Sequence, residues 1–159
     1  MTILLDNTVL SNFSTLQRPD LVVREAFIEE VVTTEHVFRE MQVGVTIGKI
    51  PPCDWQWLKN VALTSPELVR FRRLTAHLGQ GEASCLAVAV ERKYKLATDD
   101  KDARQWSRKL GISHTGTIGI LAILAKKGHI TLPEGNRFLE ELIAAGYRSP
   151  FAKLDELLL

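Results

Sequence analysis

The sequence predicts one α/β domain with a mostly parallel central sheet and helices on both faces of that sheet. Short β-branched or apolar runs alternate with longer segments whose apolar residues recur at helical spacing. Such alternation is typical of parallel sheets, because each parallel connection needs a crossover segment. Of the 159 residues, 45% are hydrophobic and 25% are charged, as in ordinary globular domains. We therefore expect residues 1–159 to form a single domain.

The first half of the chain is expected to supply three strands, at residues 2–5, 31–33 and 61–63. Asp6 ends the first strand, and Asn7 and Thr8 are typical of a helix start. Four helices are expected here. One begins near residue 7, one spans 19–27, one begins at 34 or 35, and one spans 66–74. Glycines and prolines at 44–52 separate the third of these helices from the third strand.

The second half is expected to supply a fourth strand at 95–98 and a fifth at 112–115, which gives a sheet of four to five strands. The helix at 82–92 is apolar nearly all round, so we expect it to be buried. Further helices are expected at 101–110, 116–127 and 132–145, the last two ended by Gly128 and Gly146. Apolar residues of the tail, about 150–159, recur at helical spacing and indicate an amphipathic helix.

Charge and cysteine content limit the classes of function. The net charge of +1 is too small for a protein that holds nucleic acid by bulk charge, so any such contact needs a local patch. Cys53 and Cys85 are expected to be free thiols, and the four histidines lack metal-ligand spacing. Because the chain has neither a basic leader nor a membrane-length apolar run, we expect a cytoplasmic protein with no membrane contact.

Acids follow the predicted strands at the edge where open α/β sheets build ligand sites. Asp6 follows the first strand, Glu40 lies on the helix after the second, Glu82 opens the buried helix, and Asp99 and Asp100 follow the fourth strand. Each has a simpler explanation as a helix cap or a solvated helix acid. Crowded carboxylates repel unless a cation or proton lies between them. Together they favour Mg²⁺ or Mn²⁺ and suit phosphodiester hydrolysis.

Basic and aromatic residues near this edge could contact a nucleic acid. Lys101 and Arg104 follow the acid pair and are candidates for contacts to an RNA backbone, although exposed surface charge is the more common explanation of such residues. Trp55 and Trp57 could stack on bases, but packing is the more common role of such residues.

Several segments, taken in order, resemble one family of nucleases. They are DNTVLSNF, TTEHVFRE, GQGEASCLAVA, LATDDKDAR and LGISHTGTIGILAILAKKG. The chain resembles the PIN-domain nucleases, and in particular a branch with GEA, DDKxAR and GTxGxL elements. This resemblance implies a three-layer α/β/α sandwich and a metal-dependent ribonuclease that acts on RNA. Many relatives are toxins held inactive by a small antitoxin protein, and many form homodimers, so both partners are expected here.

The resemblance also implies site residues. By position, Asp6, Glu82 and Asp100 match metal-binding acids, with Asp99 as a second candidate beside Asp100. Glu40 matches the acid of the second site segment, which completes the site or orients the attacking water. Thr8 matches a hydroxyl that hydrogen-bonds the water or a carboxylate.

Two other functions compete with a nuclease. A PIN-like fold that has lost its chemistry would serve only as a protein-binding module and would bind no metal. A phosphoacceptor receiver domain also gathers acids at a parallel-sheet edge. It needs an acid pair after the first strand, where this chain has a single acid, Asp6.

Overall fold

A parallel sheet forms the centre of the protein. The structure, a computed structural model, describes residues 2–22 and 30–158. Five strands pair in the order β3-β2-β1-β4-β5, and every pairing is parallel. The strands are β1 (Ile3–Leu5), β2 (Val31–Thr34), β3 (Lys59–Val61), β4 (Lys95–Ala97) and β5 (His114–Thr115). The predicted parallel α/β architecture is therefore confirmed.

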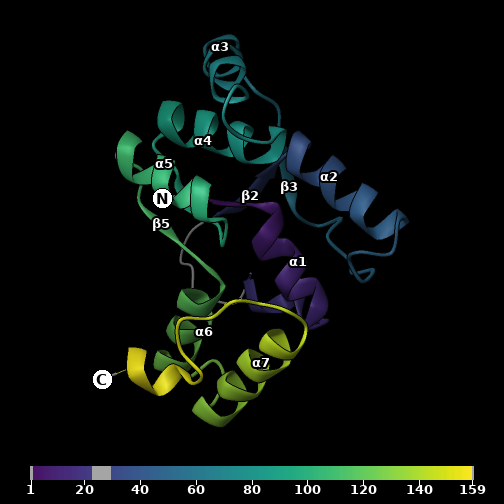
Figure 1. The fold of residues 1–159 in the computed structure, drawn as a ribbon, viewed down its shortest axis with the longest axis vertical. Coiled ribbons are helices and arrows are strands. Elements are labelled where there is room, and N and C mark those ends of the chain that lie inside the picture. Colours follow the sequence, from purple (N-terminus) through teal and green to yellow (C-terminus); the bar gives the residue numbers. More distant parts are fainter. Residues whose placement is uncertain (1, 23–29, 159) are drawn as a thin grey trace.

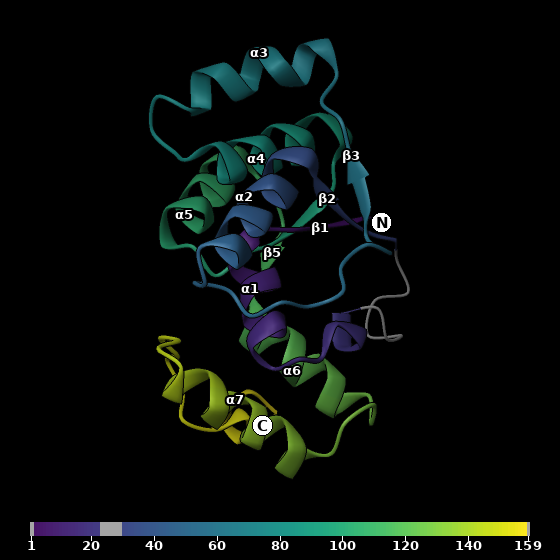
Figure 2. The same ribbon diagram turned by 90° about the vertical axis from the view of Figure 1, so that its right-hand side faces the viewer.

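Helices connect the strands and surround the sheet (Figures 1 and 2). They are α1 (Asn7–Thr15), α2 (Glu35–Thr46), α3 (Ser65–Leu74), α4 (Gln80–Arg92), α5 (Lys101–Leu110), α6 (Thr117–Lys126) and α7 (Leu132–Ala144), with 3-10 turns η1 (Pro19–Val22) and η2 (Leu154–Leu157). Figure 1 shows α3, α4 and α5 at one end of the molecule, α6 and α7 at the other, and α1 between them. The arrangement is a three-layer α/β/α sandwich, as expected.

The order of the strands determines where a ligand site can form. From β1 the chain moves outward to β2 and β3, and from β4 it moves outward in the opposite direction to β5. The topological switch point therefore lies between β1 and β4, which pair from Ile3↔Lys95 to Leu5↔Ala97. Receiver domains have the order 2-1-3-4-5. The receiver interpretation is therefore wrong for this chain.

Helix α4 is the most deeply buried helix next to this switch point. It contacts β1, β2 and β4. Its buried residues include Ala83, Ala87 and Ala89, whose short side chains allow a close approach to the strands. The predicted buried helix is confirmed, and its N-terminus lies beside the carboxyl ends of the strands that it covers.

Two local expectations differ from the structure, and a third is described only in part. The third strand is Lys59–Val61 rather than 61–63, because an edge strand with exposed residues carries Lys and Asn without an apolar run. The described part of the segment expected as a helix at 19–27 is the 3-10 turn Pro19–Val22, and residues 23–27 lie outside the described residues. The tail forms the 3-10 turn η2 instead of a longer amphipathic helix, with Leu154 buried against α6 and α7. Among the described residues, no helix is long and apolar enough to span a bilayer.

Candidate active site

Asp6 lies at the switch point, directly after β1. It is only 1% exposed. Its Oδ1 accepts a hydrogen bond of 2.7 Å from the Asn7 backbone N–H and so caps α1. Its Oδ2 accepts hydrogen bonds from the hydroxyl groups of Thr98 at 2.7 Å and Thr8 at 3.3 Å. The cap role and a site role are therefore compatible, because they use different oxygens of the carboxylate.

Two threonine hydroxyl groups tie Asp6 to the loop after β4. Thr8 Oγ1 accepts a hydrogen bond of 2.9 Å from the Asp99 backbone N–H. Thr98 Oγ1 accepts one of 3.1 Å from the Asp100 backbone N–H. The resemblance had pointed to Thr8, but no role was predicted for Thr98. Its position at a strand end, directly before two acids, is the signal that could have revealed it.

Asp100 begins α5 and also lies near Asp6. Its Oδ1 accepts a hydrogen bond of 2.7 Å from the Ala103 backbone N–H, as a helix cap does. The negative charge of Asp100 contributes to raising the pKa values of both Asp6 and Glu82. Asp100 is therefore within electrostatic reach of both acids.

Glu40 and Glu82 meet at the N-terminus of α4. Oε1 of Glu40 accepts a hydrogen bond of 2.9 Å from the Gly81 backbone N–H. A Cβ at Gly81 would lie 2.9 Å from Cδ of Glu40, so this approach requires glycine. Glu82 folds back toward Gly79, where a Cβ would lie 2.6 Å from its Oε2. Two glycines thus make room for two carboxylates.

The four acids Asp6, Glu40, Glu82 and Asp100 form what we call the acidic cluster. Burial raises the pKa of Asp6 from 3.8 to about 6, against the opposing effect of its hydrogen bonds. Burial also raises the pKa of Glu82 from 4.5 to about 7, and repulsion by the other three acids adds to that shift. Burial and three of these acids raise the pKa of the Cys85 thiol well above its usual value, so Cys85 lies among them as a neutral side chain.

The donor chemistry of the acidic cluster fits a hard divalent cation, because it offers only carboxylate oxygens and neighbouring hydroxyl groups. Within residues 2–22 and 30–158, no three acidic, histidine or cysteine side chains lie close enough together to form a preassembled metal shell. In that part of the chain, Oδ2 of Asp100 and Oε2 of Glu40 have no hydrogen-bond partner.

Asp99 belongs to a different cluster. Its oxygens accept hydrogen bonds from Nδ2 of Asn12 at 2.8 Å, the Thr117 backbone N–H at 2.9 Å and the Thr117 hydroxyl. They also accept from Nη2 of Arg104 at 3.4 Å and the hydroxyl of Tyr147 at 3.5 Å. The Asp99 side chain is only 8% exposed. These bonds occupy both oxygens, so the geometry favours Asp100 over Asp99 as a metal ligand.

The partners of Asp99 had no predicted role at the site. Asn12 follows Thr8 by one helical turn, so the two polar side chains lie on the same face of α1, but polar residues are common in this helix and do not single out Asn12. Thr117 follows Gly116, where a Cβ would lie 2.5 Å from Oδ1 of Asp99. No local pattern indicates Tyr147, which reaches Asp99 from beyond the end of α7.

The predicted nucleic-acid contacts have mixed outcomes. Arg104 donates a hydrogen bond of 3.0 Å to the Thr98 carbonyl in addition to its pairing with Asp99, so its guanidinium stabilises the loop. Lys101 is exposed. Trp55 is 2% exposed and packs in the core, as the simpler interpretation predicted. Trp57 is 42% exposed, and its indole N–H donates to the Asp54 carbonyl.

Two cavities adjoin the acidic cluster. The first, which we call the α1 cavity, measures about 420 Å³ and is lined by Asn7, Thr8, Ser11, Asn12, Asp99, Gly146, Tyr147 and Arg148. The second measures about 320 Å³ and is lined by His36, Arg39, Glu40, Val43 and Gln80. Thr8 links the first cavity to Asp6, and Glu40 belongs to both the second cavity and the cluster. The acids therefore lie between two hollows of the surface.

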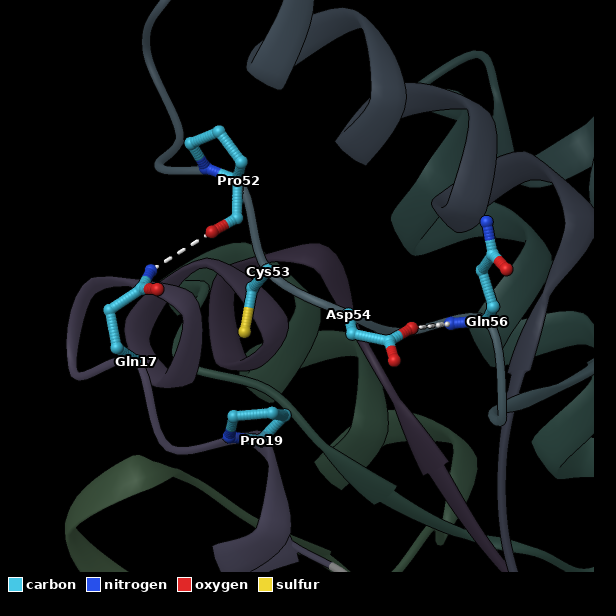
Figure 3. A pocket seen from close by; sticks show the side chains of 6 residues that line it. All are labelled: Gln17, Pro19, Pro52, Cys53, Asp54 and Gln56. Atoms are coloured by element: carbon cyan, nitrogen blue, oxygen red, sulfur yellow. Dashed lines mark hydrogen bonds between the residues drawn. The ribbon is translucent and has the colours of Figure 1, made fainter.

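A larger cavity, of about 650 Å³, lies away from the acids (Figure 3). Nε2 of Gln17 donates a hydrogen bond of 3.0 Å to the Pro52 carbonyl at its edge, and the Cys53 thiol points into it. Burial raises the pKa of that thiol. Because no residue of the acidic cluster lines this cavity, its volume does not make it the candidate active site.

Comparison with known proteins agrees with this geometry. No curated protein matches the chain. A family model described as a PIN domain matches residues 2–158. PIN domains are generally nucleases and typically bind divalent metals. Because the matched region spans nearly the whole chain, this protein belongs to the PIN-domain family.

Proposed function

We propose that this PIN-domain protein is a Mg²⁺- or Mn²⁺-dependent endoribonuclease and that the acidic cluster is its active site. The observation that carries the proposal is the mutual effect of the acids. Burial and the neighbouring charges raise the pKa of Asp6 to about 6 and that of Glu82 to about 7. Carboxylates in this state are stabilised by a proton or by a cation, and a divalent ion suits an all-oxygen donor set.

The residues of the cluster can share the work of phosphodiester hydrolysis. Water must lose a proton as its oxygen attacks phosphorus, and the leaving oxygen must gain one. Glu40, one oxygen of which accepts the Gly81 N–H, is suited to orient the attacking water with its other oxygen. Thr8 and Thr98 hold Asp6 in a fixed orientation. A bound divalent ion would lower the pKa of water and neutralise charge on the phosphate oxygens. Asp6, Glu82 and Asp100 would hold it, with Glu40 beside them.

Cleavage of end-labelled single-stranded RNA tests this proposal. The parent protein should cut the RNA with Mn²⁺ and stop when EDTA is added. Glu82→Gln should reduce kcat/KM by a factor of about 100 or more, because it removes a carboxylate that would hold the divalent ion. Glu140→Gln, on the exposed face of α7, is the matched control and should cut at the parental rate. Cleavage that persists in EDTA, or an unimpaired Glu82→Gln variant, would contradict the proposal.

We further propose that the protein acts on cytoplasmic RNA as the toxin of a toxin–antitoxin pair, with a small antitoxin as partner and a homodimer as its assembly. Only the resemblance of the sequence elements supports these roles. Induced expression of the parent in a bacterial host should arrest growth, whereas Asp6→Asn should not. Growth that continues with the parent protein present and folded would contradict the toxin role, and the nuclease test would be unaffected.

A further inference from the structure

The α1 cavity offers hydrogen-bond donors beside a cluster that offers acceptors. It is formed by α1 and by the segment after α7, which Figure 1 shows in yellow passing beside α1. Thr8 lines the cavity and also donates to Asp6. A ligand in this cavity therefore lies next to the acidic cluster.

The single carboxylate in the cavity is already neutralised. Both oxygens of Asp99 accept protein hydrogen bonds, and Arg104 pairs with it at 3.4 Å. The guanidinium of Arg148 also lines the cavity and is exposed. Within residues 2–22 and 30–158, Arg148 forms no ion pair and no side-chain hydrogen bond. The cavity therefore carries one uncompensated positive charge.

Tyr147 holds Arg148 at the cavity. Gly146 adopts a φ of +105°, a backbone conformation that favours glycine, and the Tyr147 N–H then donates to the Leu142 carbonyl at 2.9 Å. The Tyr147 hydroxyl reaches Asp99 at 3.5 Å. Burial, with the charge of Asp99, raises the pKa of Tyr147 to about 12, so this hydroxyl stays a donor at neutral pH. The segment that carries Arg148 is therefore anchored to α7 and to the loop after β4.

Asn7 supplies a neutral donor on the α1 side of the cavity. The Ser11 hydroxyl donates to Oδ1 of Asn7 at 3.4 Å, which leaves the Asn7 amide nitrogen as a donor toward the cavity. A cavity with an exposed guanidinium and an amide N–H suits an anion with several acceptor oxygens. Phosphate groups of a nucleic-acid backbone are such anions.

We infer that the α1 cavity binds the phosphate of a nucleotide next to the scissile one in an RNA strand, with Arg148 as its principal contact. The inference rests on the proposed ribonuclease function, which supplies the strand and the neighbouring scissile phosphate. The α1 side of the acidic cluster then positions the substrate. Arg148 provides the local positive charge that a protein of net charge +1 needs in order to bind a polyanionic RNA.

Fluorescence anisotropy with a short 5′-fluorescein-labelled single-stranded RNA tests the inference in EDTA, where no metal contributes. Arg148→Ala should raise Kd about tenfold and lower the slope of log Kd against log salt by about 1. Arg148→Lys should keep the salt slope while losing part of the affinity, because it retains the charge but not the planar fork. Ser11→Glu, which places an anion in the cavity, should weaken binding to a similar extent. Arg137→Ala, an exposed arginine of α7 outside the cavity, is the matched control and should bind as the parent does.

The outcomes separate this inference from the proposed function. If Arg148→Ala and Ser11→Glu both keep the parental Kd and salt slope, and thermal melting shows that both are folded, the inference is overturned. The proposed Mn²⁺-dependent cleavage would be unaffected by that result. If the parent binds RNA through Arg148 but never cuts it, the nuclease proposal fails and the binding site stands. If the parent shows no RNA binding in EDTA and Arg148→Ala cuts with the parental KM in Mn²⁺, the inference is overturned.

Discussion

The hydroxyl of Thr98 donates a hydrogen bond of 2.7 Å to the carboxylate of Asp6, across 92 positions of sequence. The same hydroxyl accepts the backbone N–H of Asp100. One side chain thus joins the end of β1 to the start of α5 and sets the spacing of two acids of the cluster. Both residues are almost fully buried, so water cannot readily replace these hydrogen bonds. Breaking them would leave buried polar groups unsatisfied and would lower the stability of the fold.

Asp6→Asn should stabilise the metal-free protein at neutral pH. Burial raises the pKa of Asp6 from 3.8 to about 6, so its stabilising contribution is complete below pH about 4 and is lost as the pH rises through 6. Removing the buried charge should raise the free energy of unfolding by about 1–3 kcal/mol at pH 7.5 in EDTA. Thermal melting should show a higher Tm for the variant at pH 7.5 and a smaller gap near pH 4. A variant less stable than the parent at pH 7.5 would contradict the assigned cause.

RNA cleavage should depend on pH through the same acids. At pH 5 both Asp6 and Glu82 are mostly protonated. Asp6 loses its proton as the pH rises through about 6, and Glu82 loses its proton as the pH rises through about 7. Cleavage with Mn²⁺ should therefore rise from pH 5 to 7 and level off above about 7.5. The measurement is kcat/KM across this range at constant ionic strength. Activity that is flat from pH 5 to 8 would show that neither acid titrates in the free enzyme as described.

Asp99→Asn and Asp100→Asn should separate structure from metal binding, although the residues are neighbours. Asparagine at position 100 can still cap α5, so stability should change little while Mn²⁺ affinity falls at least about tenfold. Asparagine at position 99 replaces an acceptor of several buried donors and the ion pair with Arg104, at a cost of about 2–4 kcal/mol.

Calorimetry with Mn²⁺ and thermal melting of both variants measure the two effects. The expected result is a destabilised Asp99→Asn that binds Mn²⁺ nearly as the parent does, and a stable Asp100→Asn that does not. If instead Asp99→Asn were stable and lost Mn²⁺ binding while Asp100→Asn was destabilised and bound Mn²⁺, Asp99 would be the ligand.

Gly81→Ala should impair the site by displacing Glu40. The new Cβ would collide with Oε2 of Glu40 and lie 2.9 Å from its Cδ, so this carboxylate has to shift from its position at the α4 N-terminus. RNA cleavage should fall about tenfold or more if Glu40 acts at the site. Gly119→Ala is the matched control, because its Cβ would meet only the rotatable hydroxyl of Thr115. Equal cleavage by both variants would remove Glu40 from the site.

Local sequence patterns predicted most of the fold. The buried character of α4 and the acid after β1 are both visible over a few residues, and so they were predicted correctly. The edge strand β3 was misplaced by two residues, because Lys59 and Asn60 are exposed and lack the apolar signal of a strand.

The composition of the site was harder to predict than the fold. Asp99 and Asp100 are adjacent, and only the path of the backbone after β4 directs one toward Asn12 and the other toward Asp6. Asn12 and Tyr147 lie 87 and 48 positions from Asp99, so their contacts depend on the tertiary structure. A single sequence carries no local periodicity that reports such contacts.

Calorimetric titration of the protein with Mn²⁺ at pH 6.5, in buffers of different ionisation enthalpy, measures both metal binding and the protons released by it. If Asp6 and Glu82 bind the ion, their raised pKa values require a saturable heat and the release of about one proton per protein. Asp6→Asn should lose most of the affinity and part of the proton release. No saturable binding, or binding by Asp6→Asn equal to that of the parent, would show that the acidic cluster is not a metal site and that this PIN domain has another function.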